Sequence, residues 1–401
     1  MAENFHDEKL DSVRIKITSF ISFLMGFAQA AMVYVLSSYF KLASGTENVG
    51  IFYAVVYVIV LLILLNFHKV VRKLGKATVY YLAVLIKIIV LVFLVMLAPS
   101  KLGMIFLMVY IIAGALEWTS LDVILESFSK DTMSGRIRGF HLTVLNAGFV
   151  FGPFVSTYIL DKIGFQSVFI FSLIFNSLVF TLSLMSFNKI NHKFEQKLKT
   201  SELLKKVIAR KNVMRIYYIS IVLEFFYSVM VIYTPIYLRD LGFSWGNIGL
   251  IFTVMLIPFV LFSYPIGYLA DKKTGEKELL IFSLFVMGIS TATLYFIGSA
   301  DILIWSIVLF ATRIGASFIG VLQDSYFYKR IDGCDVDIID FFRTSIPVGY
   351  ITGAIFSSFI IFFLPIKAVF ILAGLVILSA LYPAFKLKDN QCELKMPAKC
   401  Q

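Results

Sequence analysis

The segment from Leu116 to Phe154 reads LEWTSLDVILESFSKDTMSGRIRGFHLTVLNAGFVFGPF and joins two apolar runs through a short basic turn. It places three acids, Glu117, Asp122 and Glu126, inside or at the edge of apolar sequence. A charged side chain inside a membrane is costly, so such an acid is a candidate for a functional role. A related segment, Leu322 to Phe356, follows about 200 residues later. The pattern indicates a membrane protein built from two related parts.

The composition of the whole chain is that of an integral membrane protein. Of its 401 residues, 59% are hydrophobic and 15% are charged, and the mean hydropathy is +0.88. Soluble domains carry about 25% charged residues. The net charge of +11 would suggest nucleic-acid binding in a soluble protein, but cytoplasmic loops of membrane proteins collect Lys and Arg. We therefore expect a lipid bilayer around the chain and no nucleic-acid partner.

The apolar runs predict an all-α membrane protein with twelve transmembrane helices. Crossing the hydrocarbon core takes about 20 apolar residues. Such runs lie at 17–41, 47–67, 77–98, 102–128, 137–160, 164–187, 213–238, 245–270, 278–299, 301–330, 338–363 and 366–386. We expect a six-helix bundle over 1–187, a cytoplasmic basic linker over 188–212, and a second six-helix bundle with a short cytoplasmic tail over 213–401.

The basic residues predict the orientation of these helices. If both termini are cytoplasmic, 27 Lys and Arg residues fall in inside segments and 5 in outside segments. Cytoplasmic loops carry such an excess in membrane proteins generally. We therefore expect both termini in the cytoplasm.

Internal matches support two related halves. Asn48-Val49-Gly50 recurs as Asn247-Ile248-Gly249 at the start of the second and eighth runs. Glu126-Ser127-Phe128 likewise recurs as Asp324-Ser325-Tyr326. In transporters built from repeats, the binding site lies where the repeats meet. A site between the two halves is therefore expected.

The loop between the eighth and ninth runs carries a motif that resembles that of a known family. It reads Gly267-Tyr-Leu-Ala-Asp271-Lys-Lys-Thr-Gly275-Glu-Lys277, and on it the chain resembles the major facilitator superfamily of secondary transporters. One extra residue precedes Gly275, and the corresponding loop around Arg72 lacks the acid. The resemblance covers essentially the whole chain. It implies two rocking six-helix bundles that give alternating access to a central site.

The resemblance also implies a cytoplasmic gate, in which the loop of one half meets the start of a helix in the other. Asp271 is expected to face Arg136 and Arg138, while the loop with Arg72 faces an acidic helix start. The alternative is that the basic residues only follow the positive-inside rule. The residues expected at this gate are Asp271, Arg136, Arg138, Glu126, Asp324, Asp340, Arg343 and Arg72.

The fifth run carries a glycine motif. Proton-coupled exporters of the superfamily have a motif of this spacing, with glycine where Ser156 stands, so the motif mildly favours export. The alternative is a purely structural motif, since small residues let helices approach closely. The residues of the motif are Gly139, Gly148, Gly152 and Pro153.

By the resemblance, the first, fourth, seventh and tenth runs line a central cavity. The residues expected there are Glu117, Asp122, Glu224, Arg313, Gln29 and Tyr227. Burial without a partner favours the protonated form of a carboxyl group, so Glu224 or Asp122 is the expected proton carrier. Arg313 is expected to hold the solute or to pair with an acid. In the alternatives, Glu117 and Arg313 form a static pair, or Lys87 pairs with an acid of the fourth run.

Together these features predict a proton-coupled secondary transporter of a small-molecule substrate. We expect it to be a multi-pass monomer of the plasma (inner) membrane. We expect no enzymatic activity, cofactor or metal, because the four histidines are scattered and the phosphate-binding pattern GxxxxGK[ST] is absent. Two alternatives stay open. One is a nutrient or sugar importer or uniporter of the same fold, and the other is an intramembrane enzyme or lipid-handling protein.

Overall fold

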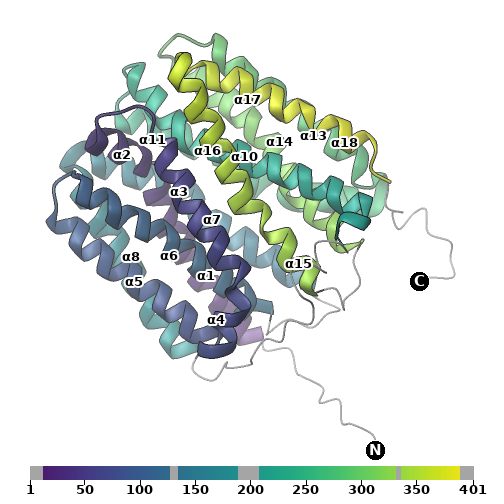
Figure 1. Ribbon diagram of the computed structural model, residues 1–401, viewed down its shortest axis with the longest axis horizontal. Coiled ribbons are helices and arrows are strands. Elements are labelled where there is room, and N and C mark those ends of the chain that lie inside the picture. The colour runs from purple at the N-terminus through teal and green to yellow at the C-terminus, as the bar shows by residue number, and fades with distance from the viewer. Residues whose placement is uncertain (1–11, 127–133, 188–206, 331–335, 389–401) are drawn as a thin grey trace, which may run out of the picture.

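The computed structural model describes residues 12–126, 134–187, 207–330 and 336–388 of the chain. Within these ranges the regular structure is helical, with short connections between the helices (Figure 1). The predicted all-α class is therefore confirmed.

The first half contains eight helices in the described residues. They are α1 (Ser12–Val33), α2 (Leu36–Ser44), α3 (Gly50–Leu65), α4 (Phe67–Leu74), α5 (Lys76–Met96), α6 (Lys101–Glu126), α7 (Ser134–Ile163) and α8 (Phe165–Ser186). The first predicted run is divided at Tyr34 into α1 and α2. The short helix α4 occupies the basic loop that follows α3.

The second half follows the same plan after the linker. Its elements are α10 (Lys211–Asp240), α11 (Trp245–Leu261), α12 (Ser263–Leu269), the π-helical turn η1 (Ala270–Thr274), α13 (Lys277–Thr293), the 3₁₀ turn η2 (Leu294–Phe296), α14 (Ile302–Tyr328), α15 (Val336–Arg343), α16 (Ser345–Phe363), α17 (Ala368–Ser379) and α18 (Leu381–Phe385). The turn η1 contains Asp271 of the loop motif.

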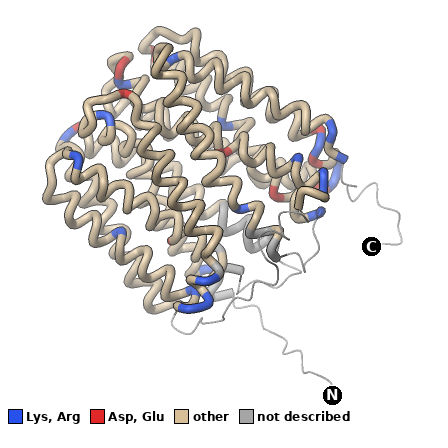
Figure 2. The backbone as a smooth tube through the Cα atoms, in the orientation of Figure 1, with Lys and Arg blue, Asp and Glu red and all other residues tan. Residues whose placement is uncertain are grey.

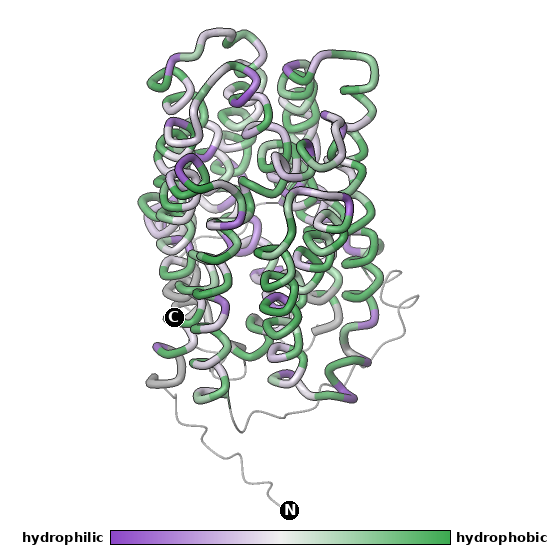
Figure 3. Tube along the Cα trace, turned by 90° about the vertical axis from the view of Figure 1, so that its left-hand side faces the viewer, coloured by the Kyte–Doolittle hydropathy of each residue, from purple (hydrophilic) through white to green (hydrophobic). Residues whose placement is uncertain are grey.

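Eleven helical stretches in the described chain are long and apolar enough to cross a membrane. Helix α3 is apolar but has only 16 residues. The twelfth span and the cytoplasmic position of the termini therefore stay predictions. Apolar residues cover most of the sides of the bundle (Figure 3), while most charged residues lie toward its ends (Figure 2).

The two halves use glycine at equivalent places. The loop after α4 and the loop after η1 both turn at a glycine with positive φ, Gly75 at 88° and Gly275 at 81°. A residue with a side chain rarely adopts this conformation. The two loops therefore have a similar backbone conformation at their glycine, although only the second loop contains an acid, Asp271.

Glycines also set the closest helix contacts. A Cβ atom on Gly152 of α7 would lie 2.9 Å from backbone atoms of α1, and one on Gly353 of α16 would lie 2.9 Å from the Phe225 carbonyl of α10. Such distances are shorter than real Cβ contacts allow. The pairs α1–α7 and α10–α16 are thus equivalent tight packings, one in each half.

Two helix pairs join the halves: α3 packs on α16, and α7 packs on α11. In Figure 1, α3 and α16 lie side by side across the middle of the molecule.

Candidate functional site

An ion pair closes one end of the boundary between the halves. Lys41 Nζ, at the end of α2, lies 2.7 and 3.0 Å from the two carboxylate oxygens of Asp240, at the end of α10. Lys41 also donates to Glu47 Oε1 at 3.2 Å. The Lys41 side chain is 29% exposed and that of Asp240 is 37% exposed, so solvent screens the pair.

The same end carries hydrogen bonds between the halves. The Gly50 N–H donates to the Tyr233 hydroxyl at 3.1 Å, and Asn48 Nδ2 donates to the Ser358 carbonyl at 3.2 Å. A Cβ atom on Gly50 would lie 2.7 Å from the Ala354 carbonyl, so only glycine allows α3 to approach this closely. We call Lys41, Asn48, Gly50, Tyr233, Asp240 and Ser358 the outer seal.

The outer seal lies on the axis that relates the repeats. Gly50 and Gly249 are equivalent by their repeated sequence, and they are 199 residues apart. Lys41 and Asp240 are also 199 residues apart, so they occupy equivalent positions and yet touch each other. A residue meets its own equivalent only at the twofold axis. The ion pair therefore marks where the axis leaves the molecule.

Glu224 interacts electrostatically with groups of both halves and with Asp324 of α14. It lies in the middle of α10, is partly exposed, and has no hydrogen bond or ion pair with any described side chain. Tyr57 of α3 and Tyr350 of α16 stack across the boundary, with ring centroids 4.2 Å apart. Both tyrosines interact electrostatically with Glu224. An ionisable group thus stands beside an aromatic contact that joins the halves.

Arg313 of α14 lies beside Tyr227 of α10. Its side chain is 1% exposed, and its guanidinium carbon lies 4.8 Å from the Phe226 ring centroid and 5.9 Å from that of Tyr227. Its Nη1 atom has no hydrogen-bond partner among the described residues, and no described acid lies within 4.0 Å of it. Tyr227 interacts electrostatically with both Glu224 and Arg313. We call Glu224, Tyr227 and Arg313 the central charge site.

Two residues of the first half approach or face the same boundary. Tyr34, at the break between α1 and α2, interacts with the Arg313 guanidinium and packs 4.7 Å from the Phe252 ring of α11. Gln29 of α1 is partly exposed, and its Oε1 atom has no partner among the described residues. The role expected for Gln29 stays a prediction.

Glu117 has a partner inside the first half. Its Oε2 lies 2.5 Å from Lys87 Nζ of α5, and both side chains are at most 1% exposed. The Lys87 ammonium also lies 5.1 Å from the Tyr110 ring centroid. The alternative in which Glu117 pairs with Arg313 is therefore wrong, and the one in which Lys87 pairs with an acid of the fourth run is confirmed. The prediction that Glu117 serves the solute or the proton is untested.

The loop motif makes a network within the second half. Lys329 Nζ lies 2.6 Å from Asp271 Oδ1 and 2.7 Å from Oε1 of the buried Glu276, which also accepts from Ser325 Oγ at 2.8 Å. Burial lowers the pKa of Lys329, but its hydrogen bonds to the two acids outweigh this and raise it above the usual value. Asp271 thus has a partner in its own half, which sequence reasoning did not anticipate.

The other residues expected at the cytoplasmic gate are only partly described. Arg72 of α4 is exposed, and Asp324 and Arg343 are partly buried and interact with other groups. The expected pairing of Asp271 with Arg136 and Arg138 stays a prediction. The expected residues whose side chains lie outside the description are Asp122, Glu126, Arg136, Arg138, Gly139 and Asp340.

The glycine motif of α7 packs helices in this structure. Gly152 meets Ala30 and Ala31 of α1, and Gly148 meets the backbone at Phe23 and Phe27. The Pro153 carbonyl accepts from the Thr157 hydroxyl at 2.8 Å and faces Gly249 of α11. These contacts support the structural interpretation of the motif.

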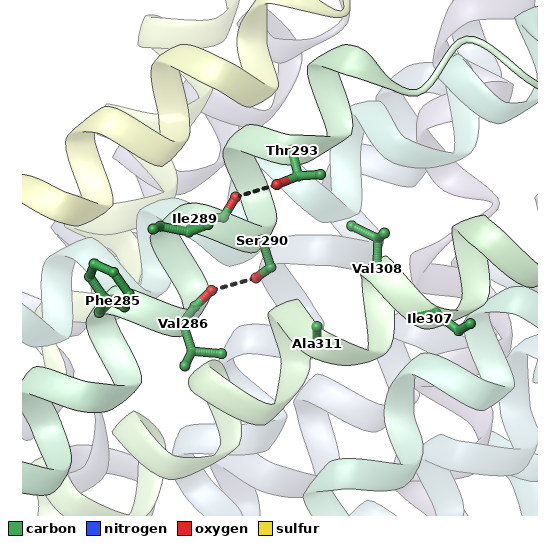
Figure 4. A pocket seen from close by; sticks show the side chains of 8 residues that line it. All are labelled: Phe285, Val286, Ile289, Ser290, Thr293, Ile307, Val308 and Ala311. Carbon is green, nitrogen blue, oxygen red and sulfur yellow. Dashed lines mark hydrogen bonds between the residues drawn. The ribbon is translucent and has the colours of Figure 1, made fainter.

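A groove of about 360 Å³ lies between α13 and α14 (Figure 4). Its hydroxyl groups already bond within their own helix: Ser290 donates to the Val286 carbonyl at 2.6 Å and Thr293 to that of Ile289 at 2.9 Å. The exposed side chains of Phe285 and Ile307 complete an apolar lining. The hydroxyl donors of this groove are therefore already used within α13, and its lining is otherwise apolar.

Sequence comparisons place these features in a family. A profile of the Major Facilitator Superfamily matches residues 112–331, more than half of the chain. The chain is 22% identical over 271 residues to Multidrug resistance protein MdtG of Klebsiella pneumoniae (strain 342), and this match covers 66% of the chain and 65% of that protein. It thus spans slightly less than two thirds of the relative's length.

Solved structures show the same fold. The structure of the nucleoside transporter NupG superposes with a TM-score of 0.69 at 16% identity, covering 94% of this chain and 100% of NupG. A point mutant of NupG gives a TM-score of 0.70 at 15% identity, covering 93% of this chain and 99% of the mutant. At this identity the likeness establishes the architecture alone.

Proposed function

The chain belongs to the major facilitator superfamily, and we propose that it is a proton-coupled secondary transporter whose solute binds at the central charge site. As a multi-pass member of this superfamily it is a transporter of a small solute. The finer proposal adds the proton, the site and the residues that carry them. It further places the protein as a monomer in the plasma membrane, with its two six-helix halves joined by the linker over 188–212.

One observation carries the proposal: two opposite charges in the membrane interior stay apart. Glu224 and Arg313 make no ion pair with each other or with any described residue, although both lie near Tyr227. Unpaired charges at this depth are costly and mark substrate or ion pathways in membrane proteins. A static structural role would be served better by direct pairing, as at Lys87 and Glu117.

The proton is assigned to Glu224. A carboxyl group that is buried without a partner binds a proton more readily, and Glu224 is partly open to the boundary while Arg313 is not. The neighbouring Tyr57–Tyr350 stack joins the halves beside it. A change of protonation at Glu224 therefore acts where the halves separate.

The outer seal supplies the second element of alternating access. In this structure the halves are bonded together at the end that carries Lys41 and Asp240. Rocking of the halves has to break these bonds to open that end. The exchange of this seal for a closed cytoplasmic gate completes the proposed cycle.

The direction of transport follows from the sign of the solute charge. A bound cation opposes proton binding at Glu224 and gives antiport, whereas a bound anion favours it and gives symport. The glycine motif of α7 and the MdtG relative favour an exporter, while the NupG structures fit the importer alternative equally.

The test is transport by purified protein in liposomes. Wild type, Glu224→Gln and Glu224→Asp are compared under an imposed pH gradient, with a panel of labelled nucleosides, organic cations and organic acids. We expect Glu224→Gln to lose gradient-driven accumulation and to keep gradient-independent exchange, and Glu224→Asp to recover part of the coupling.

Glu278→Gln is the matched control, because Glu278 is an exposed acid at the start of α13 and undergoes the same chemical change. It should behave as the wild type. Unchanged pH dependence in Glu224→Gln would rule out Glu224 as the proton carrier. Counterflow of the solute with no gradient effect in the wild type would show a uniporter.

A further inference from the structure

Arg313 differs from the other deeply buried cation in the described part of the chain. Lys87 is fully buried and has Glu117 at 2.5 Å. Arg313 is 1% exposed and has no described acid within 4.0 Å. Of these two buried cations, Lys87 is therefore neutralised by an acid, whereas Arg313 has no counter-charge among the described residues.

The aromatic rings around Arg313 do not replace that counter-charge. Phe226 and Tyr227 approach the guanidinium at 4.8 and 5.9 Å, which are cation–π distances. The Tyr34 hydroxyl also interacts with the guanidinium, but the Nη1 atom of Arg313 has no hydrogen-bond partner in the described residues. An unsatisfied, charged donor in a dry environment is strongly unfavourable. The geometry therefore calls for an acceptor at Nη1.

We propose that the solute of this transporter is an organic monoanion with an aromatic or other apolar body, whose carboxylate binds Arg313. This inference rests on the proposed transport function and names its substrate class. A carboxylate pairs well with the edge of a guanidinium group. A single described cation balances a single negative charge, and the rings of Phe226, Tyr227 and Tyr34 suit an apolar body better than a hydrated inorganic ion.

The anion also sets the sign of proton coupling. Tyr227 interacts electrostatically with both Glu224 and Arg313, and Glu224 also interacts with Asp324 of α14, Tyr57 and Tyr350. A further negative charge in this space disfavours the ionised form of Glu224. Because coupling between two ligands is reciprocal, a bound proton favours the anion by the same factor as the anion favours the proton. Anion and proton then travel together, so an inward proton gradient drives import of the anion.

The first experiment uses three probes with the same ring and different charge: benzoate, benzamide and benzylammonium. Each is titrated calorimetrically into purified wild-type protein in detergent. We expect benzoate to bind and the neutral and cationic probes to bind at least ~10-fold more weakly, since only benzoate pairs with Arg313. Preference for benzylammonium, equal binding of all three, or binding of none overturns the proposal.

The second experiment changes the arginine. We expect Arg313→Gln to weaken benzoate binding roughly 100-fold, as for loss of one member of a buried charge pair, and Arg313→Lys to recover part of it. Lys162→Gln is the control, because Lys162 is an exposed cation at the end of α7 and its loss changes the net charge equally. Wild-type benzoate affinity in folded Arg313→Gln contradicts the assignment. The comparison of probes on wild-type protein decides the matter if the variant does not fold.

Proton uptake separates this inference from the proposed function. Benzoate added to weakly buffered wild-type protein between pH 6 and 9 should draw up to about one proton per anion bound, and Glu224→Gln should abolish the uptake. Uptake that persists in Glu224→Gln removes Glu224 as the proton carrier but leaves the anion site standing. If the protein prefers the cationic probe and its pH-driven transport still depends on Glu224, the proposed transport function is supported and the anionic substrate is excluded.

Discussion

The pair of Lys87 and Glu117 allows a sharp stability prediction. The perturbation is a cycle of three variants: Lys87→Met, Glu117→Leu and the double variant. Each single variant leaves one charge buried, because both side chains are at most 1% exposed and the joining distance is 2.5 Å. We expect transport by the double variant to keep the wild-type pH dependence, since the pair lies within one half.

The magnitude follows from the burial of the two groups. Breaking a buried ion pair by removing one partner costs about 3–5 kcal/mol, whereas replacing both partners by apolar residues of similar size is often neutral or stabilising. The double variant should therefore lie within about 1 kcal/mol of the wild type or above it. Tyr110 offers Lys87 a cation–π contact, worth about 2 kcal/mol in a desolvated place, which is less than the cost of losing Glu117.

The assay is unfolding in mixed micelles, followed by circular dichroism and checked for reversibility. A positive result is a double variant that is at least ~2 kcal/mol more stable than either single variant, beyond the ~0.5 kcal/mol error of additivity. If both single variants unfold like the wild type, or if the two losses simply add, the reasoning about burial is refuted. Glu278→Gln, at an exposed acid, should change little.

Two further predictions concern the boundary between the halves. A Cβ atom on Gly349 would collide with Glu224 and with the Ile221 carbonyl at 2.8 Å, so Gly349→Ala should reduce coupled transport about 10-fold or more, whereas Gly320→Ala, with open space around it, should not. Wild-type coupling in Gly349→Ala would contradict the packing argument. Lys41→Asp or Asp240→Lys should raise labelling of a cysteine at Ser358 by a membrane-impermeant maleimide about 2–5-fold, because a screened pair is worth about 0.5–1 kcal/mol. The double exchange should restore the wild-type labelling rate. Equal labelling of the single and double variants would show that the ion pair of Lys41 and Asp240 does not hold this end closed.

The fold was largely predictable because it depends on composition and period. Apolar runs of membrane length and the repeated Asn-Val-Gly and Asn-Ile-Gly segments identify the helices and the two halves. The loop motif around Asp271 identifies the family. These signals lie along the chain, and no knowledge of packing is needed to read them. Helix α3 is the exception, since its predicted span of 47–67 has only 16 helical residues.

The partners of the charged residues were harder to predict. Depth along a helix can be counted from the sequence, and Glu117, Glu224 and Arg313 each lie several turns inside the helices α6, α10 and α14. The rotation of each helix and the identity of its neighbour cannot be counted in this way. Equal depth suggested Arg313 as a partner of Glu117, but α5 lies beside α6 and supplies Lys87 instead.

The pattern of residues along the chain was enough to indicate a helical membrane protein of the major facilitator superfamily with acids and bases inside its apolar runs. Tertiary structure alone decided which of those charges neutralise each other and which do not. Lys41 and Asp240 meet because they lie on the axis between the halves, and Lys87 meets Glu117 because two helices pack closely. Glu224 and Arg313 form no ion pair with a described residue, although both interact electrostatically with Tyr227. Pairing depends on distances of a few ångströms between helices, and the order of residues along a chain does not fix such distances.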